Sequence, residues 1–167
     1  MKQSTAIIVC DHGLGHLRRC LLLAKTREQH GEQVLVFAPI QKVERLQLCS
    51  PSFASIKVHD FSTRTSPESV RRSFPEVVEW LYRLPSLDRF DTIICDNLVE
   101  IVLLRSDSII SALFFWHHVV KGANKHYSNF CDRLLADCNP TVLGCRLFSM
   151  DSVRALAGYE PVDLYKI

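Results

Sequence analysis

The 167-residue sequence has little net charge, few glycines and prolines, and no long apolar run. Twenty Lys and Arg against 18 Asp and Glu leave a formal charge of +2 without a basic stripe of interleaved aromatic residues, so we expect no nucleic-acid partner. Six glycines and seven prolines among 47% hydrophobic residues exclude a collagen-like or disordered chain. The apolar runs at residues 6–10 and 109–116 are too short for a signal peptide or a membrane span. We therefore expect a cytoplasmic protein and leave peripheral membrane contact open.

Several sequence motifs are also missing. The seven cysteines include no Cys-x-x-Cys pair, which argues against a zinc ribbon or a disulfide framework and predicts reduced, mostly buried thiols. No Gly-x-Ser-x-Gly elbow and no Gly-Lys-Ser/Thr sequence is present, which argues against a nucleophilic hydrolase and a P-loop. His12 lies four residues before His16, but the glycines between them break the helix that a metal-binding pair needs. The sequence therefore predicts no metal site.

Short apolar runs alternate with stretches of helical periodicity along the whole chain. This alternation is typical of an α/β fold with a parallel sheet. We expect a single domain over residues 1–167, built as an open Rossmann-like parallel sheet of about six strands with helices on both faces, and an exit segment at about 146–167. The expected strands are residues 6–10, 34–37, 56–58, 92–95, 109–115 and 141–143, and the expected helices follow Gly15 and cover about 43–48, 75–84, 98–104, 127–138 and 151–157.

Polar residues directly follow three of the expected strands. Residues 11–19 follow the first, Asp96 and Asn97 follow the fourth, and His117 and His118 follow the fifth. Because ligands of open parallel sheets bind beyond the carboxyl ends of the strands, we expect these residues to line one crevice. Asp96 serves either as a base for a substrate hydroxyl or as a cap of the next helix. Only one of the two histidines can face the crevice, because neighbouring residues of a strand point to opposite sides.

Two glycines, Gly13 and Gly15, lie at the turn between the first strand and the first helix. Glycines let the backbone turn sharply and approach a ligand, and the N–H groups of a helix N-terminus attract an anion. A dinucleotide site does not fit, because Arg18 stands where the third glycine of that fingerprint belongs. The second strand also ends in Ala38 and Pro39 rather than in an acidic residue for a ribose.

Residues 7–39, which contain Gly-x-Gly-His followed by arginine, resemble the opening of the GT-B glycosyltransferases. They are similar to the family 28-like N-acetylglucosaminyltransferases of peptidoglycan and related pathways, and to the UDP-sugar hydrolase of pseudaminic acid synthesis. The resemblance extends, less specifically, through residues 94–97 (ICDN) and 114–120 (FFWHHVV). It therefore covers nearly the whole chain.

The resemblance implies one half of a GT-B fold, in which two Rossmann-like domains face each other across a cleft. The first domain mainly holds the acceptor, a sugar or a lipid-linked molecule, and the second holds the nucleotide-sugar donor. This chain resembles the first domain only, so we expect it to be inactive in isolation and to need a C-terminal domain or a partner subunit. The resemblance implies no cofactor and no required metal. Two alternatives stay open, namely half of a nucleotide-sugar hydrolase and a non-catalytic subunit of a split glycosyltransferase.

The resemblance also assigns roles to single residues. His16 would lie near the transferred sugar in an acid-base or electrostatic role, although a histidine here can also cap the helix start. Arg18 would reach a phosphate or orient the loop, or else lie in solvent, where we also place Arg19. The expected catalytic residues are His16 and Asp96, and the expected substrate-binding residues are His12, Gly13, Gly15, Arg18, Asn97, His117 and His118. The sequence identifies neither the sugar nor the acceptor.

Overall fold

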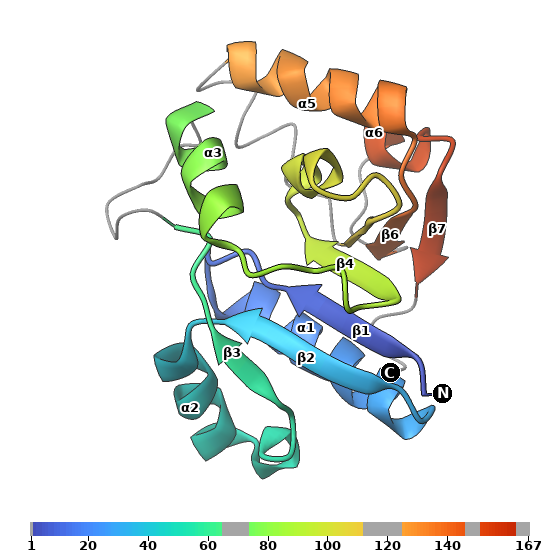
Figure 1. Cartoon of the computed structure of the whole chain (residues 1–167). Coiled ribbons are helices and arrows are strands. Elements are labelled where there is room, and N and C mark those ends of the chain that lie inside the picture. The colour runs from blue at the N-terminus through green and yellow to red at the C-terminus, as the bar shows by residue number, and fades with distance from the viewer. Residues whose placement is uncertain (1, 65–73, 112–124, 146–150, 163–167) are drawn as a thin grey trace.

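A parallel β-sheet forms the centre of the computed structural model, which describes residues 2–64, 74–111, 125–145 and 151–162 (Figure 1). The described strands pair in the order β3-β2-β1-β4-β5-β6-β7, and every pair is parallel. The predicted α/β, Rossmann-like sheet is therefore confirmed. The strands are β1 (Ser4–Ile8), β2 (Gln33–Ala38), β3 (Val58–Asp60), β4 (Thr92–Asp96), β5 (Ile109–Ser111), β6 (Val142–Cys145) and β7 (Tyr159–Val162).

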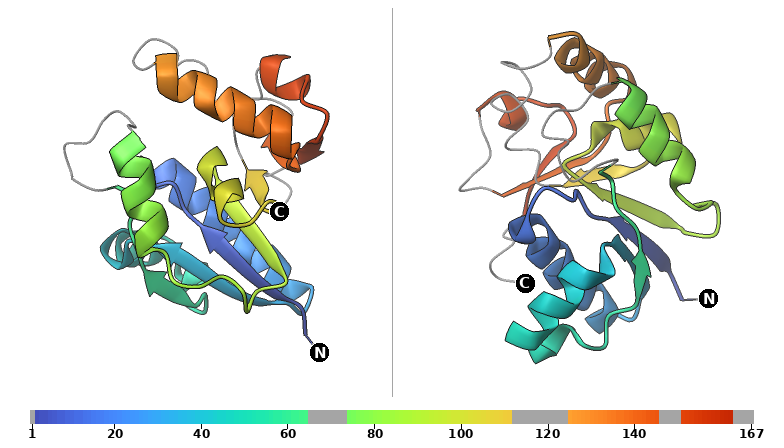
Figure 2. Two further views of the ribbon diagram at one scale, coloured as in Figure 1. Left: turned by 45° about the horizontal axis from the view of Figure 1, so that its top comes forward. Right: turned by 90° about the vertical axis from the view of Figure 1, so that its left-hand side faces the viewer.

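Helices cover both faces of the sheet (Figure 2). The helices α1 (Leu14–Gln29) and α2 (Ile40–Cys49) contribute buried side chains to one face. The other face is covered by α3 (Phe74–Arg83), the 3₁₀ helix η2 (Val99–Leu103) and α5 (Lys125–Cys138). Two shorter elements complete the described chain, the 3₁₀ helix η1 (Pro51–Phe53) and α6 (Asp151–Arg154). None of the described helices is long and apolar enough to cross a membrane.

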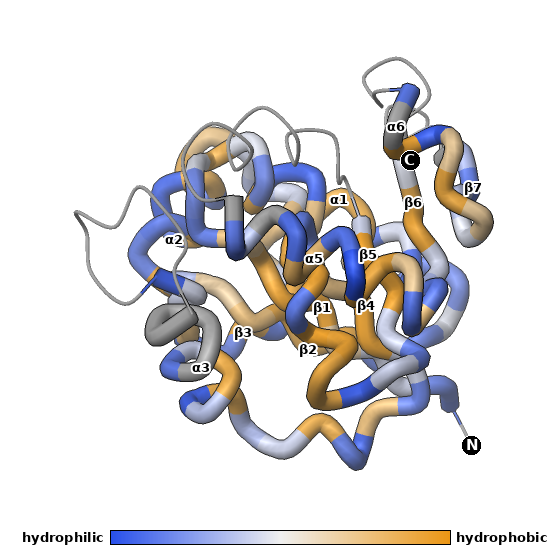
Figure 3. Tube along the Cα trace, turned by 90° about the horizontal axis from the view of Figure 1, so that it is seen from above, coloured by the Kyte–Doolittle hydropathy of each residue, from blue (hydrophilic) through white to orange (hydrophobic). Residues whose placement is uncertain are grey.

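The central strand β1 is buried on both of its faces. Ala6, Ile8 and Cys10 belong to the cluster under α3 and α5, whereas Ile7 and Val9 belong to the cluster under α1 and α2. Each of these side chains is at most 1% exposed. This two-sided burial is why the run carries no polar alternation, as is typical of parallel sheets. The tube coloured by hydropathy shows the same feature, because β1, β4 and β5 are drawn mainly in hydrophobic colours (Figure 3).

The described sheet has seven strands, not about six, because the segment predicted as an exit contains β7. This strand pairs in parallel with β6, from Val142 opposite Tyr159 to Cys145 opposite Val162. Its residues Glu160 and Pro161 are exposed, so the strand has no apolar run that would mark it in the sequence. A proline is tolerated here because β7 forms the edge of the sheet, where one side makes no ladder hydrogen bonds.

Four other element predictions need correction or completion. The third strand covers Val58–Asp60 rather than 56–58, because Ile56 lies in the bend after η1, where it is buried without joining the sheet. The helix predicted at 98–104 is the shorter 3₁₀ helix η2. The helix predicted at 151–157 ends at Arg154. Of the fifth predicted strand, 109–115, the described part is β5, and the rest lies outside the described residues.

The strand order places a topological switch point between β1 and β4. From β1 the chain continues outward through β2 and β3, and then returns to β4 on the other side of β1. Ile8 is opposite Cys95 in this pairing, so the carboxyl ends of the two strands lie side by side. Open α/β sheets bind ligands outside the strand ends at such a point. The fold therefore predicts a ligand site at the residues that follow β1 and β4.

Candidate functional site

The turn after β1 depends on Gly13, which precedes the first residue of α1. Its φ of 143° lies in the region that side chains rarely adopt, so the glycine is needed for the backbone. No side chain caps the start of α1. His16 is already inside the helix, and its side chain does not cap it as one of the two sequence interpretations proposed. The first turn of α1 also contains no acidic residue that would offset the positive end of the helix dipole.

His16 contacts Asp96 across the switch point. Its Nδ1 forms a short hydrogen bond with Oδ2 of the carboxylate, and the two side chains are 12% and 1% exposed. Asp96 ends β4, and its second oxygen accepts a longer hydrogen bond from Ser111 Oγ at 3.4 Å. An ionised carboxylate only accepts hydrogen bonds, so the Nδ1–H of His16 is the donor. The neutral ring then carries its lone pair on Nε2.

The structure bears on one of the two interpretations of Asp96. The alternative function, capping of the next helix, is not what the carboxylate does, because the residue before η2 is Leu98 and no side chain caps that helix. Asp96 instead holds His16, which lies 80 residues earlier in the chain. Since its side chain is only 1% exposed, Asp96 is placed to orient the imidazole rather than to touch a substrate itself.

The two arginines of the first helical turns lie in different environments. Arg18 is exposed, as one of its two interpretations has it. The prediction that Arg19 faces solvent is wrong, because its side chain is half-buried and its Nη2 lies 3.1 Å from His16 Nδ1. The reason is helical geometry: side chains three residues apart share a face, and the Cα–Cβ bond points toward the helix N-terminus. Arg19 is therefore a neighbour of the His16–Asp96 pair.

Asp11 anchors the loop that carries the glycines, a role that the sequence analysis missed. It is 7% exposed, and its carboxylate contacts Lys42 Nζ of α2 and accepts a 2.6 Å hydrogen bond from Ser62 Oγ. Its backbone N–H donates to Thr63 Oγ1 at 3.0 Å. These partners are 31 to 52 residues away in the sequence. The one available signal was a carboxylate placed directly after a buried strand.

A buried thiol, Cys20, lies close enough to the carboxylate of Asp96 to respond to its charge. The pKa of Cys20 is raised well above its usual value, first by burial and then by the negative charge of Asp96, while the positive charge of Arg19 lowers it. Cys10 and Cys95 add smaller raising effects. The prediction of reduced, mostly buried thiols is confirmed for the described side chains, because Cys10, Cys20, Cys95 and Cys131 are buried and form no disulfide. The raised pKa keeps the buried Cys20 thiol uncharged beside Asp96.

For the remaining predicted site residues, the structure gives no side-chain contact with the His16–Asp96 pair. His12 is exposed in the loop, and its backbone N–H donates to the Cys10 carbonyl. Asn97 follows Asp96 with a φ of 58°, and its backbone N–H donates to the Ser111 carbonyl at 2.8 Å. His117 and His118 lie outside the described residues. Among the residues that the structure describes, no three His, Cys, Asp or Glu side chains are grouped in a way that could hold a metal ion.

Gly15 differs from Gly13, although the sequence assigned both to the turn. It lies inside α1 without a positive φ, and a Cβ there would meet Arg19 Nη1 at an ordinary 3.6 Å. We expect Gly15→Ala to leave the free energy of unfolding unchanged or to raise it by up to about 1 kcal/mol, because alanine is the better helix former. Gly13→Ala should lower it by about 1–3 kcal/mol through backbone strain. Urea unfolding of both variants checks this, and equal losses would contradict the distinction.

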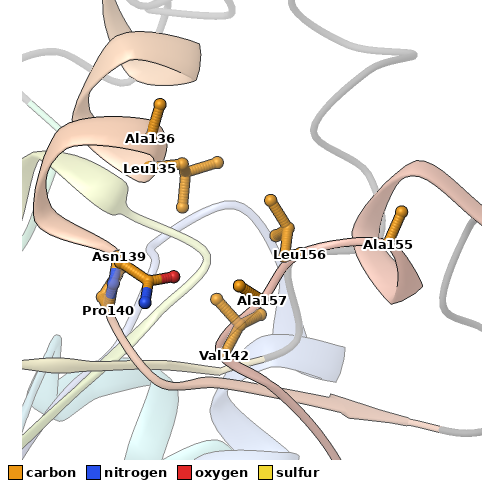
Figure 4. Close-up of a pocket in the computed structure, with 8 residues that line it drawn as sticks. All are labelled: Leu135, Ala136, Asn139, Pro140, Val142, Ala155, Leu156 and Ala157. Carbon is orange, nitrogen blue, oxygen red and sulfur yellow. The ribbon is translucent and has the colours of Figure 1, made fainter.

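A hollow in the structure lies away from these residues (Figure 4). It is formed by the end of α5, the start of β6 and the connection from α6 to β7, with eight lining residues: Leu135, Ala136, Asn139, Pro140, Val142, Ala155, Leu156 and Ala157. The first residue of β6 lines it, so it opens at the amino ends of the strands. It is therefore at the edge of the sheet opposite the His16–Asp96 pair.

Comparisons with known proteins leave the family open. No protein-family model matches the chain, and no curated protein matches it. Among solved structures, the chain is similar to one described as the crystal structure of LpCGTa in complex with UDP, with 16% sequence identity and a TM-score of 0.43. That match covers 66% of this chain and 30% of the other. The chain thus spans less than a third of the structure that it matches.

Proposed function

We propose that this chain is the acceptor-binding half of a nucleotide-sugar-dependent glycosyltransferase, with His16 as the base that activates an acceptor hydroxyl. The observation that carries the proposal is the contact of His16 Nδ1 with buried Asp96 at the switch point between β1 and β4. Buried carboxylates that hold a histidine in this way fix its tautomer and orientation. The resemblance of residues 7–39 to GT-B enzymes is a second, independent support.

The proposed reaction assigns one step to each member of the pair. Nε2 of His16 takes the proton of the acceptor hydroxyl while the oxygen attacks the anomeric carbon of the donor. The bond from that carbon to the nucleoside diphosphate breaks, and the diphosphate leaves with the bonding electrons. Asp96 accepts the hydrogen bond from Nδ1–H and stabilises the imidazolium that forms. The proposal gives Asp96 this role rather than that of a direct base, because its carboxylate is 1% exposed.

Other parts of the predicted site remain proposals about binding. We assign substrate contacts to His12, Gly13, Gly15, Arg18 and Asn97, with the positive end of α1 stabilising negative charge on a substrate. The proposal assigns no metal and no cofactor to the chain. The donor would bind to a C-terminal domain or to a partner subunit. A cytoplasmic location, and peripheral membrane contact to reach a lipid-linked acceptor, belong to the same proposal.

Hydrolysis of a nucleotide sugar is the second candidate, because Nε2 of His16 can take a proton from water as well as from an acceptor. The assay uses the full-length protein together with any chain that co-purifies with it. This sample is incubated with each of several nucleotide sugars. Each donor is tested with and without a mixture of sugar and lipid-linked acceptors, and mass spectrometry identifies the products. We expect release of nucleoside diphosphate that requires an acceptor and is lost in His16→Asn.

Each other outcome of this assay decides against the proposal. Free sugar formed without any acceptor indicates the hydrolase. Turnover that does not depend on His16 contradicts the role of the His16–Asp96 pair. A stable complex with a separate donor-binding chain, active even when His16 is replaced, indicates the non-catalytic subunit of a split enzyme.

A further inference from the structure

The side chain of Asn97 carries a buried oxygen that the fold leaves unsatisfied. Its Oδ1 has no hydrogen-bond donor among the residues that the structure describes. Such an atom loses its hydrogen bonds to water on folding and gains none in return, so it opposes the folded state. Buried polar groups in native proteins are nearly always paired, and an exception calls for a reason.

The backbone of Asn97 does not supply that reason. Its φ of 58° is left-handed, a conformation that asparagine tolerates and glycine adopts freely. The turn also uses the backbone N–H, which donates to the Ser111 carbonyl at 2.8 Å and which glycine would provide equally. Glycine would therefore form this turn without the unsatisfied oxygen, so the turn by itself does not account for the amide.

The position of Asn97 points to a ligand instead. The residue directly follows Asp96 at the carboxyl end of β4, next to the switch point where open α/β sheets bind ligands. Ser108 Oγ also lacks a partner among the described residues, but Ser108 precedes β5 and so lies at the amino edge of the sheet. Asn97 as a whole is only half-buried. The terminal torsion of an asparagine side chain is broad, so with no donor holding Oδ1, a rotation can bring the oxygen to a donor on a ligand.

We propose that Asn97 is a specificity-determining residue of the acceptor site, where its Oδ1 accepts a hydrogen bond from a hydroxyl of a polyhydroxylated acceptor. This inference rests on the proposed function, in which another hydroxyl of the same acceptor gives its proton to His16, the partner of the adjacent Asp96. A sugar carries several hydroxyl groups, so one can attack while a second satisfies Asn97. An acceptor with a single hydroxyl leaves the amide oxygen unpaired and is bound less well.

Replacement by glycine separates a binding role from a structural one. Asn97→Gly removes the amide and keeps a residue suited to a positive φ. Asn139→Gly is the matched control, because Asn139 has a φ of 42° and is exposed after the end of α5. We expect the urea midpoint of Asn97→Gly to lie at or above that of Asn139→Gly, since only the first change removes an unsatisfied buried oxygen. A lower midpoint for Asn97→Gly would show that the amide stabilises the fold, and the proposal would fail.

NMR of the side-chain amides tests binding without turnover. The Asn97 amide signal is the one that Asn97→Gly removes from the spectrum of the full chain. We expect this signal to shift when methyl glycosides of glucose, galactose, mannose or xylose are added, and to stay in place when ethanol supplies the same concentration of hydroxyl groups. The Asn139 signal should not move with any of them. No shift of the Asn97 signal with any glycoside overturns the proposal, as does an equal shift with ethanol.

Sugar transfer provides a further readout. Asn97→Gly is expected to lower kcat/KM about tenfold for a polyhydroxylated acceptor, the loss that one hydrogen bond accounts for. For the deoxy derivative that lacks the contacting hydroxyl, the same variant should stay within about twofold of the unchanged chain. Equal losses for every monodeoxy derivative and for the parent acceptor would show that Asn97 pairs with no hydroxyl. The unfolding and NMR readouts do not depend on turnover or on His16, so either this inference or the proposed function can fail without the other.

Discussion

Replacement of His16 by asparagine is expected to lower kcat/KM of sugar transfer by about 10²–10⁴-fold, the usual contribution of a positioned general base. Asparagine can still donate a hydrogen bond to Asp96, so the packing at the switch point should be preserved. It has no nitrogen that takes up a proton, and the acceptor hydroxyl then loses its base. Initial rates at saturating donor and varied acceptor measure the change.

His30→Asn is the matched control for this experiment. His30 ends the same helix at its opposite terminus, where its Nδ1 lies 2.7 Å from the Thr26 carbonyl oxygen. The same substitution there should leave the rate within about twofold of the unchanged enzyme, because a polar change away from the site has little effect. If His16→Asn also stays within that range while its unfolding curve is unchanged, His16 is not the base.

Gly158→Ala is expected to lower the free energy of unfolding by about 2–3 kcal/mol, at the upper end of what overpacking costs. A Cβ at this position would lie 2.2 Å from the Pro140 carbonyl oxygen and 3.0 Å from its carbon. Both are backbone atoms just before β6, so neither can swing aside as a flexible side chain would. Relief of the clash would also pull on the 2.7 Å hydrogen bond that the Gly158 carbonyl accepts from the Val142 N–H.

Urea unfolding of Gly158→Ala next to Gly15→Ala tests this expectation. The two substitutions add the same methyl group, but only the first meets backbone. A loss below about 0.5 kcal/mol for Gly158→Ala, which is the range of neutral surface changes, would show that β6 and β7 separate at low cost. The close approach of these strands would then not be part of what holds β7 in the sheet.

Much of the fold was predictable because its signals are local. The apolar runs of β1, β2 and β4 mark strands that are covered on both faces, and such strands need no partner to be recognised. The face of α1 formed by Leu17, Cys20, Leu21 and Ala24 is buried as its spacing predicts. The edge strand β7 carries neither signal. Its exposed Glu160 and Pro161 are typical of a loop. The segment is a strand because it pairs with β6.

The alternation of strands and helices, the turn at Gly13 and the polar residues after the strands could all be read from the sequence. Which of those residues meet depends on the packing of the whole chain. His16 reaches Asp96 across 80 residues, and Asp11 reaches Lys42 across 31, because the strand order brings β4 next to β1 and α2 next to the glycine loop. Pairing of this kind is set by register and burial over the whole sheet, and no window of neighbouring residues contains that information.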